Sequence, residues 1–219
     1  RYRSYHGATF GAIALTGDPR RTAWEPAVMP GVVHFLDPYR YRSTFHKNSS
    51  DVSEAQFTQD YLHHLEEVIQ YEGPASIAGI LMETVTGTNG VIIPPAGYLQ
   101  GVREICDRYG IVMILDEVMS GFGRTGEWFA ADHWKVVPDI MTMAKGLTSA
   151  YAPLGAVAMK SEIAAAYNDR VYEGMIIGVS NKGNDMVVNG QREKKLTNIR
   201  AAGSDEAIQL IPVQDMTLE

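Results

Sequence analysis

The chain has 219 residues, of which 45% are hydrophobic and 21% charged, and its formal net charge is −7. This composition is typical of a globular protein with one large core or two small ones. The acidic balance argues against nucleic acid or an anionic membrane as the main partner, and every apolar run is shorter than the ~20 residues of a membrane-spanning helix. With one cysteine, Cys106, the chain has no intrachain disulfide and no cysteine metal cluster, so we expect a cytoplasmic location.

The first 50 residues are predicted to hold one helix and a long connection. Residues 8–17 carry small and apolar side chains suited to a helix that packs on a sheet and ends at Gly17. Residues 18–50 contain four prolines and are predicted to be mostly irregular, with a short strand at 32–35. The tyrosines and arginines at 39–42 could stack or bind phosphate, but an exposed loop is the favoured interpretation.

A long amphipathic helix is predicted from residue 53 to residue 71. Ser53 or Asp51 can cap it, and Gly73 followed by proline ends it. We expect His63 and its neighbour His64 to lie at the surface rather than to bind a metal. The apolar positions recur at intervals of three and four residues, which places them on one helix face: Phe57, Tyr61, Leu62, Leu65, Val68 and Ile69.

Apolar runs that do not alternate with polar residues predict strands at 77–82, 111–115 and 140–144. Such runs are typical of strands buried on both faces of a parallel sheet. A helix over 98–109 lies between the first two strands, and a further strand is predicted at 154–159. The predicted fold is therefore α/β, with a mostly parallel mixed sheet flanked by helices in a three-layer α/β/α arrangement.

The helix over 98–109 is expected to turn Leu99, Val102, Ile105 and Cys106 inward and to end at Gly110. A last helix is predicted at residues 161–167, with Ser161 as its cap.

Three of the predicted strands end in a charged residue: Glu83, Asp116 and Lys145. In parallel sheets, ligands bind beyond the carboxyl ends of the strands. Asp116 and Lys145 would project from the same edge of the sheet, where a carboxylate and an amine can meet one ligand.

Other interpretations of this edge are weaker. Gly121, Gly123 and Gly126 satisfy the dinucleotide fingerprint, but no helix is predicted to open directly from them. Asp116 and Glu117 are adjacent, so on a strand they point to opposite faces and do not act on one substrate atom. A divalent metal held by Asp116, Glu83 and a histidine stays open as an alternative, although the nearby lysine argues against a simple cation site.

A lysine and an aspartate at one strand edge suit pyridoxal phosphate. In an apolar setting that lowers its pKa, a lysine forms a Schiff base with a carbonyl. An aspartate from a neighbouring strand can pair with a protonated pyridine nitrogen, and the protonated ring accepts carbanion electrons. The alternative, that Lys145 is a solvated residue and Asp116 a cap, also stays open on spacing alone.

The order of the motifs resembles the class III pyridoxal-phosphate aminotransferases of fold type I. The resemblance runs from about Tyr2 to Gly174. It includes the run Tyr5 to Thr9, the segment from Glu83 to Pro95, the stretch from Leu115 to Gly126, and the run from Pro138 through Lys145 to Gly155.

This resemblance implies a role for each matching residue. Lys145 would hold the cofactor and move a proton between substrate and cofactor, and Asp116 would pair with the pyridine nitrogen. Val118 would pack on one face of the ring and Tyr5 on the other. The remaining implied residues shape the wall beside Tyr5 or hold the pocket in place: His6, Gly7 and Glu83.

The implied reaction moves an amino group from a small-molecule amine donor to a keto-acid acceptor such as pyruvate. The run from Glu83 to Gly90 resembles the branch that uses ω-amino acids or taurine with pyruvate, because it lacks the second acid that the ornithine-type branch carries near Thr88. The family resemblance also implies a homodimer or a dimer of dimers.

The resemblance divides the chain into a partial cofactor-binding large domain at 1–174 and a tail of unknown relationship at 175–219. The chain begins with Arg1 and carries a motif of the resemblance within its first residues, so we expect a piece of a larger protein. The segments that bind the cofactor phosphate and the substrate carboxylate in the family have no counterpart in it. The alternative function is therefore a truncated, non-catalytic α/β fragment of such an enzyme.

Overall fold

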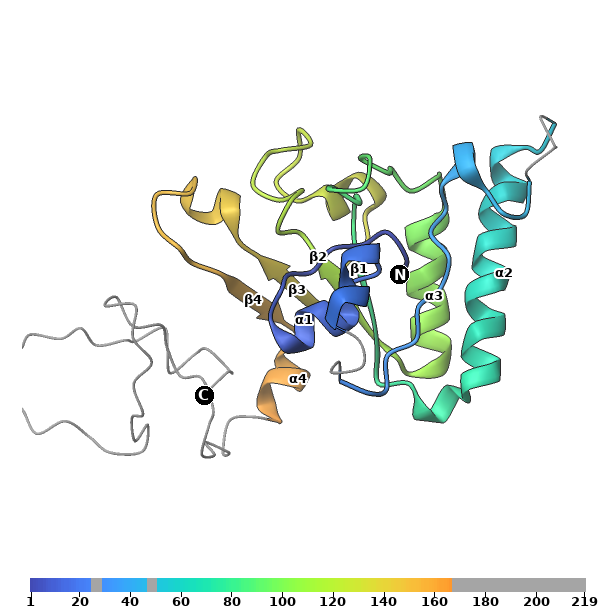
Figure 1. Ribbon diagram of the computed structural model, residues 1–219, viewed down its shortest axis with the longest axis horizontal. Helices are drawn as coiled ribbons and strands as arrows, with labels where there is room; N and C mark the ends of the chain where they lie inside the picture. The colour runs from blue at the N-terminus through green and yellow to red at the C-terminus, as the bar shows by residue number, and fades with distance from the viewer. Residues whose placement is uncertain (25–28, 47–50, 167–219) are drawn as a thin grey trace, which may run out of the picture. The chain divides into compact units, whose positions relative to one another are not determined.

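The computed structural model describes residues 1–24, 29–46 and 51–166 (Figure 1). The chain divides into two compact units, Arg1–Ala158 and Met159–Glu219. The described part of the second unit contains the helix α4, Ser161–Ala165, whose N-cap position is held by Lys160 and not by Ser161 as predicted. The expected end of this helix at Tyr167 and the predicted tail at 175–219 lie outside the described residues.

A four-stranded sheet forms the centre of the first unit, in the order β1-β2-β3-β4. Its strands are β1 (Gly79–Glu83), β2 (Val112–Asp116), β3 (Ile140–Met143) and β4 (Ala156–Met159). The pairs β1/β2 and β2/β3 are parallel. The structure confirms the predicted α/β fold, a mixed sheet with helices beside it. The strands predicted at 77–82, 111–115, 140–144 and 154–159 are all present within two residues of their expected bounds.

Helices α2 (Glu54–Glu72) and α3 (Tyr98–Tyr109) lie side by side, and α3 packs against β2 (Figure 1). The predicted cap of α2 is confirmed, because the Ser53 hydroxyl accepts a hydrogen bond from the Gln56 amide at 3.1 Å. Gly110 ends α3 in the left-handed conformation, which glycine adopts without a steric penalty.

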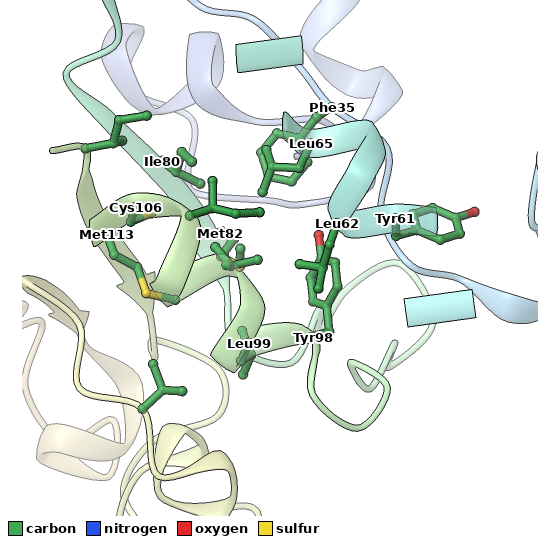
Figure 2. Close-up of a cluster of buried hydrophobic side chains, with 14 of the residues drawn as sticks. Phe35, Tyr61, Leu62, Leu65, Ile80, Met82, Tyr98, Leu99, Cys106 and Met113 are labelled. Atoms are coloured by element: carbon green, nitrogen blue, oxygen red, sulfur yellow. The ribbon is translucent and has the colours of Figure 1, made fainter. Parts of the chain in front are cut away.

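The core of this unit lies where α2 and α3 meet the sheet (Figure 2). Met82 of β1, Leu99 of α3 and Met113 of β2 have no exposed surface. Each side chain of this size contributes about 1.5–3 kcal/mol on burial. The helices approach closely at Gly101, where a Cβ atom would lie 2.3 Å from a terminal methyl carbon of Leu62.

Two predictions for the N-terminal third need correction. Helix α1 spans only Phe10–Leu15, and the expected strand at 32–35 is absent from the described residues. The Phe35 carbonyl accepts one hydrogen bond from the Tyr2 amide at 2.9 Å, but no ladder continues from it, so the chain is extended without being a strand. The described residues within 18–24 and 29–46 are otherwise irregular apart from two short 3-10 helices, Pro19–Trp24 and Arg40–Arg42.

The two adjacent histidines of α2 differ. The side chain of His63 is 74% exposed, as expected for a surface residue. His64 is half-buried, and its Nε2 accepts a hydrogen bond from the Leu36 amide at 3.1 Å, so it holds the extended segment against α2. Burial lowers the pKa of His64 below its ordinary value of 6.5. Separately, none of the described helices has the length and apolar character that crossing a membrane requires.

We predict that Gly101→Val destabilises the first unit by about 1–3 kcal/mol, because the new side chain must displace the buried Leu62. Gly11→Val in α1 is the matched control, since a Cβ atom at Gly11 has open space around it. Urea unfolding measures both variants. Equal midpoints for the two would contradict the close helix contact.

We predict that His64 makes folding less favourable as the pH falls through and below about 6.5. The unfolded chain takes up a proton on this imidazole near pH 6.5, whereas the folded chain keeps it neutral to lower pH, so protonation favours unfolding. The measurement is the urea midpoint at pH 7.5 and at pH 5.5. His64→Gln should reduce the difference between the two midpoints, and His63→Gln should leave it intact.

Candidate active site

The strand register brings the predicted charged residues to one edge of the sheet. Glu83 of β1 is paired with Asp116 of β2, and Asp116 with Thr142 of β3. Lys145 follows Thr142 by three residues and begins the short 3-10 helix Lys145–Thr148, with a left-handed backbone at φ 46°. Non-glycine residues in this conformation are uncommon and cluster at functional sites.

Asp116 is 6% exposed and has two hydrogen-bond partners. Its Oδ2 lies 2.8 Å from Nδ1 of His6, and its Oδ1 accepts from the Val118 amide at 3.0 Å. The His6 side chain is itself buried, and its Nε2 is a buried polar atom without a partner. His6 therefore contacts the carboxylate directly, a closer association than the wall position expected for it.

Glu83 is 2% exposed and connects the N-terminal segment to the loop after β1. Its carboxylate accepts hydrogen bonds from the Tyr5 amide at 2.8 Å and from the Gly87 amide at 2.7 Å. A carboxylate with two backbone donors is well stabilised in the interior. The structure thus places Tyr5 beside the end of β1, as His6 lies beside the end of β2.

Gly7 continues the same segment with a backbone that other residues rarely adopt. Its φ is +122°, and a Cβ atom there would lie 3.2 Å from the Cβ of Ala12. The amide of His6 donates to the Thr16 hydroxyl at 3.0 Å. The close approach of Gly7 to Ala12 and the hydrogen bond from His6 to Thr16 hold this segment near α1 and keep His6 at the sheet edge.

Glu117 is a residue whose role the sequence interpretation missed. It has no exposed surface, and its carboxylate accepts hydrogen bonds from the Thr84 hydroxyl at 2.8 Å and from the Ala131 amide at 2.9 Å. The Ala130 amide at 3.2 Å and the Ser120 hydroxyl complete the set of donors. Asp116 and Glu117 thus bind different partners, as the alternation of a strand requires. The sequence signal that could have indicated its burial is its position directly after a buried strand.

The glycine-rich segment beside Lys145 forms turns and bends, without the helix that a dinucleotide fingerprint requires. It nevertheless contacts the residue after the lysine. A Cβ atom at Gly146 would lie 2.9 Å from the Cβ of Phe122 and 3.3 Å from the Gly121 carbonyl. Close packing of Gly146 on this segment places Lys145 next to it.

The Asp116 carboxylate fits the pyridine ring of pyridoxal phosphate. The Asp116 carboxylate has lone-pair capacity for a third partner, such as a ring N–H, beyond its two present ones. Lys145 is exposed, so the apolar setting expected for its amine is not what the described residues provide. Within those residues, no group of three or more His, Cys, Asp and Glu side chains is placed to hold a metal ion, which removes support for the metal alternative with Asp116 and Glu83.

Two family models match the chain. One, described as aminotransferase class-III, matches residues 2–174. The other, described as the TypA/BipA C-terminal domain, matches residues 138–219. The matches overlap over residues 138–174. The second match includes all of residues 175–219, the tail of unknown relationship.

Curated relatives and solved structures agree with the first match. A taurine–pyruvate aminotransferase of Bilophila wadsworthia is 42% identical over 154 residues, which are 70% of this chain and 32% of the relative. A putrescine–pyruvate aminotransferase of Pseudomonas aeruginosa is 38% identical over 77% of this chain and 36% of its own length. The chain thus spans about a third of these relatives.

Among solved structures, the taurine:2-oxoglutarate aminotransferase from Bifidobacterium kashiwanohense, in complex with PLP and glutamate, superposes with a TM-score of 0.72. It is 52% identical, and the match covers 78% of this chain and 38% of that one.

We predict that Glu117→Leu destabilises the first unit by on the order of 3 kcal/mol, because four buried donors lose their acceptor. Thermal unfolding measures the effect. Glu127→Leu, a change at an exposed glutamate, is the control and should cost less than about 0.5 kcal/mol. A loss at Glu117 no larger than that of the control would refute its structural role.

Proposed function

Because this chain belongs to the class III aminotransferase family, we propose that it binds pyridoxal phosphate at the sheet edge and contributes part of an aminotransferase site. In this proposal residues 1–174 are a partial large domain that binds the cofactor, and residues 175–219 are a separate tail. The observation that carries the proposal is the buried Asp116–His6 pair on the same sheet edge as Lys145.

The cofactor, when bound, supplies an aldehyde that takes the amino group and a ring that accepts electrons from the substrate carbon. The chain supplies the groups around it. Lys145 holds the cofactor and carries the proton at the substrate carbon. Asp116 accepts a hydrogen bond from the pyridine nitrogen and favours its protonated form, since a nearby negative charge stabilises a cation.

The neighbouring residues keep this carboxylate and the ring in place. The Nδ1 atom of His6 lies 2.8 Å from Oδ2 of Asp116, so the imidazole orients this oxygen of the carboxylate. Val118 packs on one face of the cofactor ring and Tyr5 on the other, with Gly7 allowing the turn beside Tyr5. Glu83 holds the Tyr5 backbone, which fixes the position from which the tyrosine ring extends.

The proposed reaction transfers an amino group from an ω-amino acid, taurine or another amine to pyruvate or a similar keto acid. Support for this substrate class comes from the names of the relatives, which include taurine–pyruvate and putrescine–pyruvate aminotransferases. The uncharged run from Thr84 to Gly90 agrees with it. We further propose a cytoplasmic homodimer, supported by the family and by the single cysteine.

A second candidate is a non-catalytic fragment that keeps the α/β sheet. The match of residues 138–219 to a different family favours it, because these residues include β3 and the Lys145 that follows it. The two candidates differ in one property, which is whether the chain binds the cofactor through Lys145.

We predict that the purified chain gains the visible absorption of bound pyridoxal phosphate and that borohydride fixes the cofactor on Lys145, as peptide mapping would show. Lys145→Ala should abolish the fixed adduct. Lys135→Ala is the matched control, since Lys135 is also exposed and also has a positive φ, 53°.

An adduct that persists in Lys145→Ala would overturn the assignment of this lysine. No adduct on the parent chain would favour the non-catalytic fragment. A parent chain that forms the adduct is then assayed for amino transfer with taurine or putrescine as donor and pyruvate as acceptor. Pyruvate is converted to alanine if the proposed substrate class is correct.

A further inference from the structure

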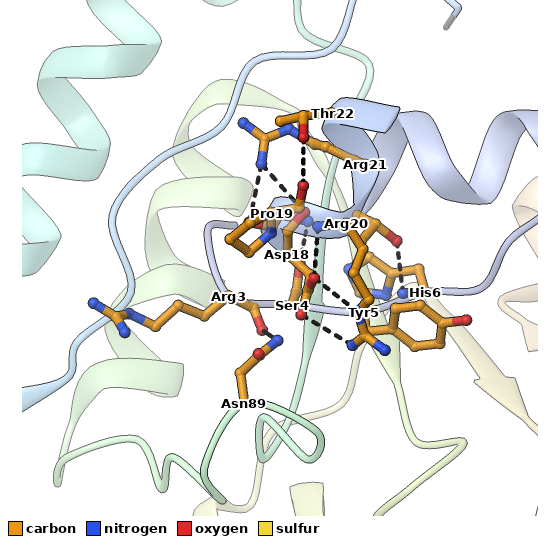
Figure 3. Close-up of polar contacts among 12 residues, drawn as sticks. Arg3, Ser4, Tyr5, His6, Asp18, Pro19, Arg20, Arg21, Thr22 and Asn89 are labelled. Atoms are coloured by element: carbon orange, nitrogen blue, oxygen red, sulfur yellow. Dashed lines mark hydrogen bonds and ion pairs between the residues drawn. The ribbon is translucent and has the colours of Figure 1, made fainter. Parts of the chain in front are cut away.

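Arg20 lies over the ring of Tyr5, the residue that the proposed function places against the cofactor (Figure 3). The guanidinium carbon is 4.7 Å from the ring centroid. A planar cation at this distance is attracted by the electron-rich face of the ring. No aromatic ring within the described part of the chain packs against Tyr5, so Arg20 is the stacking partner that the structure provides for it.

Arg20 is held in this place by Asp18. Its Nε donates to Oδ1 at 2.8 Å and its Nη2 to Oδ2 at 2.9 Å, which is the two-pronged geometry that only arginine offers to a carboxylate. The Arg20 amide donates to the same carboxylate at 2.8 Å. These contacts hold the pKa of Asp18 well below its usual range, so the carboxylate stays ionised at neutral pH.

Asp18 is itself fixed to the segment that carries Tyr5. It is 4% exposed, and its amide donates to the Ser4 carbonyl at 3.0 Å. Gly17 donates to the same carbonyl at 3.0 Å, and a Cβ atom at Gly17 would collide with the Arg1 carbonyl at 2.0 Å. The backbone before Asp18 therefore crosses the backbone before Tyr5 at close range, with no space for a side chain between them.

We propose that Arg20 is a positioning residue for the cofactor site, which covers one face of the Tyr5 ring and leaves the other face directed at the cofactor. The inference rests on the proposed function, because it assigns the free face of the ring to pyridoxal phosphate. Tyr5 is then fixed twice, through its backbone by Glu83 and through its ring by Arg20.

The next residue offers a comparison within the same short helix. Arg21 also places its guanidinium over a tyrosine, at 5.6 Å from the ring centroid of Tyr2. It donates to the Gly17 carbonyl at 3.2 Å and so has a structural role of its own. Tyr2 has no place in the proposed site, so Arg21 separates an effect on the site from an effect on the segment.

The experiment is a double-mutant cycle on pyridoxal phosphate binding by the full chain, measured by fluorescence titration. Arg20→Gln should raise the Kd for pyridoxal phosphate by about two- to fivefold, the size of an exposed cation–π contact. In the Tyr5→Leu background the same change should leave the Kd unaltered. Arg21→Gln, the matched control, should leave the Kd at the parent value in both backgrounds.

A second cycle needs no cofactor. The urea midpoints of the parent, Arg20→Gln, Tyr5→Leu and the double variant should show a larger loss for Arg20→Gln in the parent than in the Tyr5→Leu background. The loss that remains without Tyr5 reports the ion pair with Asp18.

An equal increase in Kd in both backgrounds would overturn the proposal, because Arg20 would then act without Tyr5. Additive losses in the urea cycle would overturn it as well. Absence of pyridoxal phosphate binding by the parent chain would refute the proposed function, and with it the role of Arg20 toward the cofactor, whereas the urea cycle would still report whether Arg20 holds the ring.

Discussion

The buried carboxylate of Glu117 is the interaction on which the sheet edge depends. Isolated from water, an ionised carboxylate is costly unless donors surround it, and here two hydroxyl and two amide groups do so. These donors come from the end of β1, the turn after β2 and the segment after the glycine-rich loop. The Glu117 amide also donates to the Thr142 carbonyl of β3 at 2.9 Å. One residue thereby sets the relative positions of four chain segments. Because side chains alternate along a strand, the neighbouring Asp116 side chain is directed to other partners.

The candidate site is built from strand ends and from a segment remote in sequence. Tyr5 contacts Glu83, 78 residues away, and His6 contacts Asp116, 110 residues away. Both contacts join the N-terminal segment to paired positions on β1 and β2. Residues on rigid strands thus orient a segment that has little regular structure of its own. This division of labour is common where a scaffold positions functional loops.

Local sequence patterns predicted the regular elements well where burial and propensity agree. The bounds of α3 match the prediction, because its apolar spacing and its terminal Gly110 both favour the same helix. The prediction of a strand at 32–35 was wrong because a short apolar run has the same sequence pattern whether or not a neighbouring strand pairs with it. The surface position of His64 was wrong because helix periodicity does not reveal that Leu36 packs over that turn.

The sequence by itself determined the fold class, the order of the four sheet strands and their helices, and the charged residues at or just after three strand ends, which are Glu83, Asp116 and Lys145. Periodicity and strand-end chemistry are local properties, and they are legible in a single chain. Only the tertiary structure decided that His6 pairs with Asp116, that Glu117 is a buried acceptor, and that Arg20 lies over Tyr5. Each of these contacts joins segments that the register of the strands and the crossing of the N-terminal backbone bring together. The linear pattern of residue types does not say which donor reaches which acceptor.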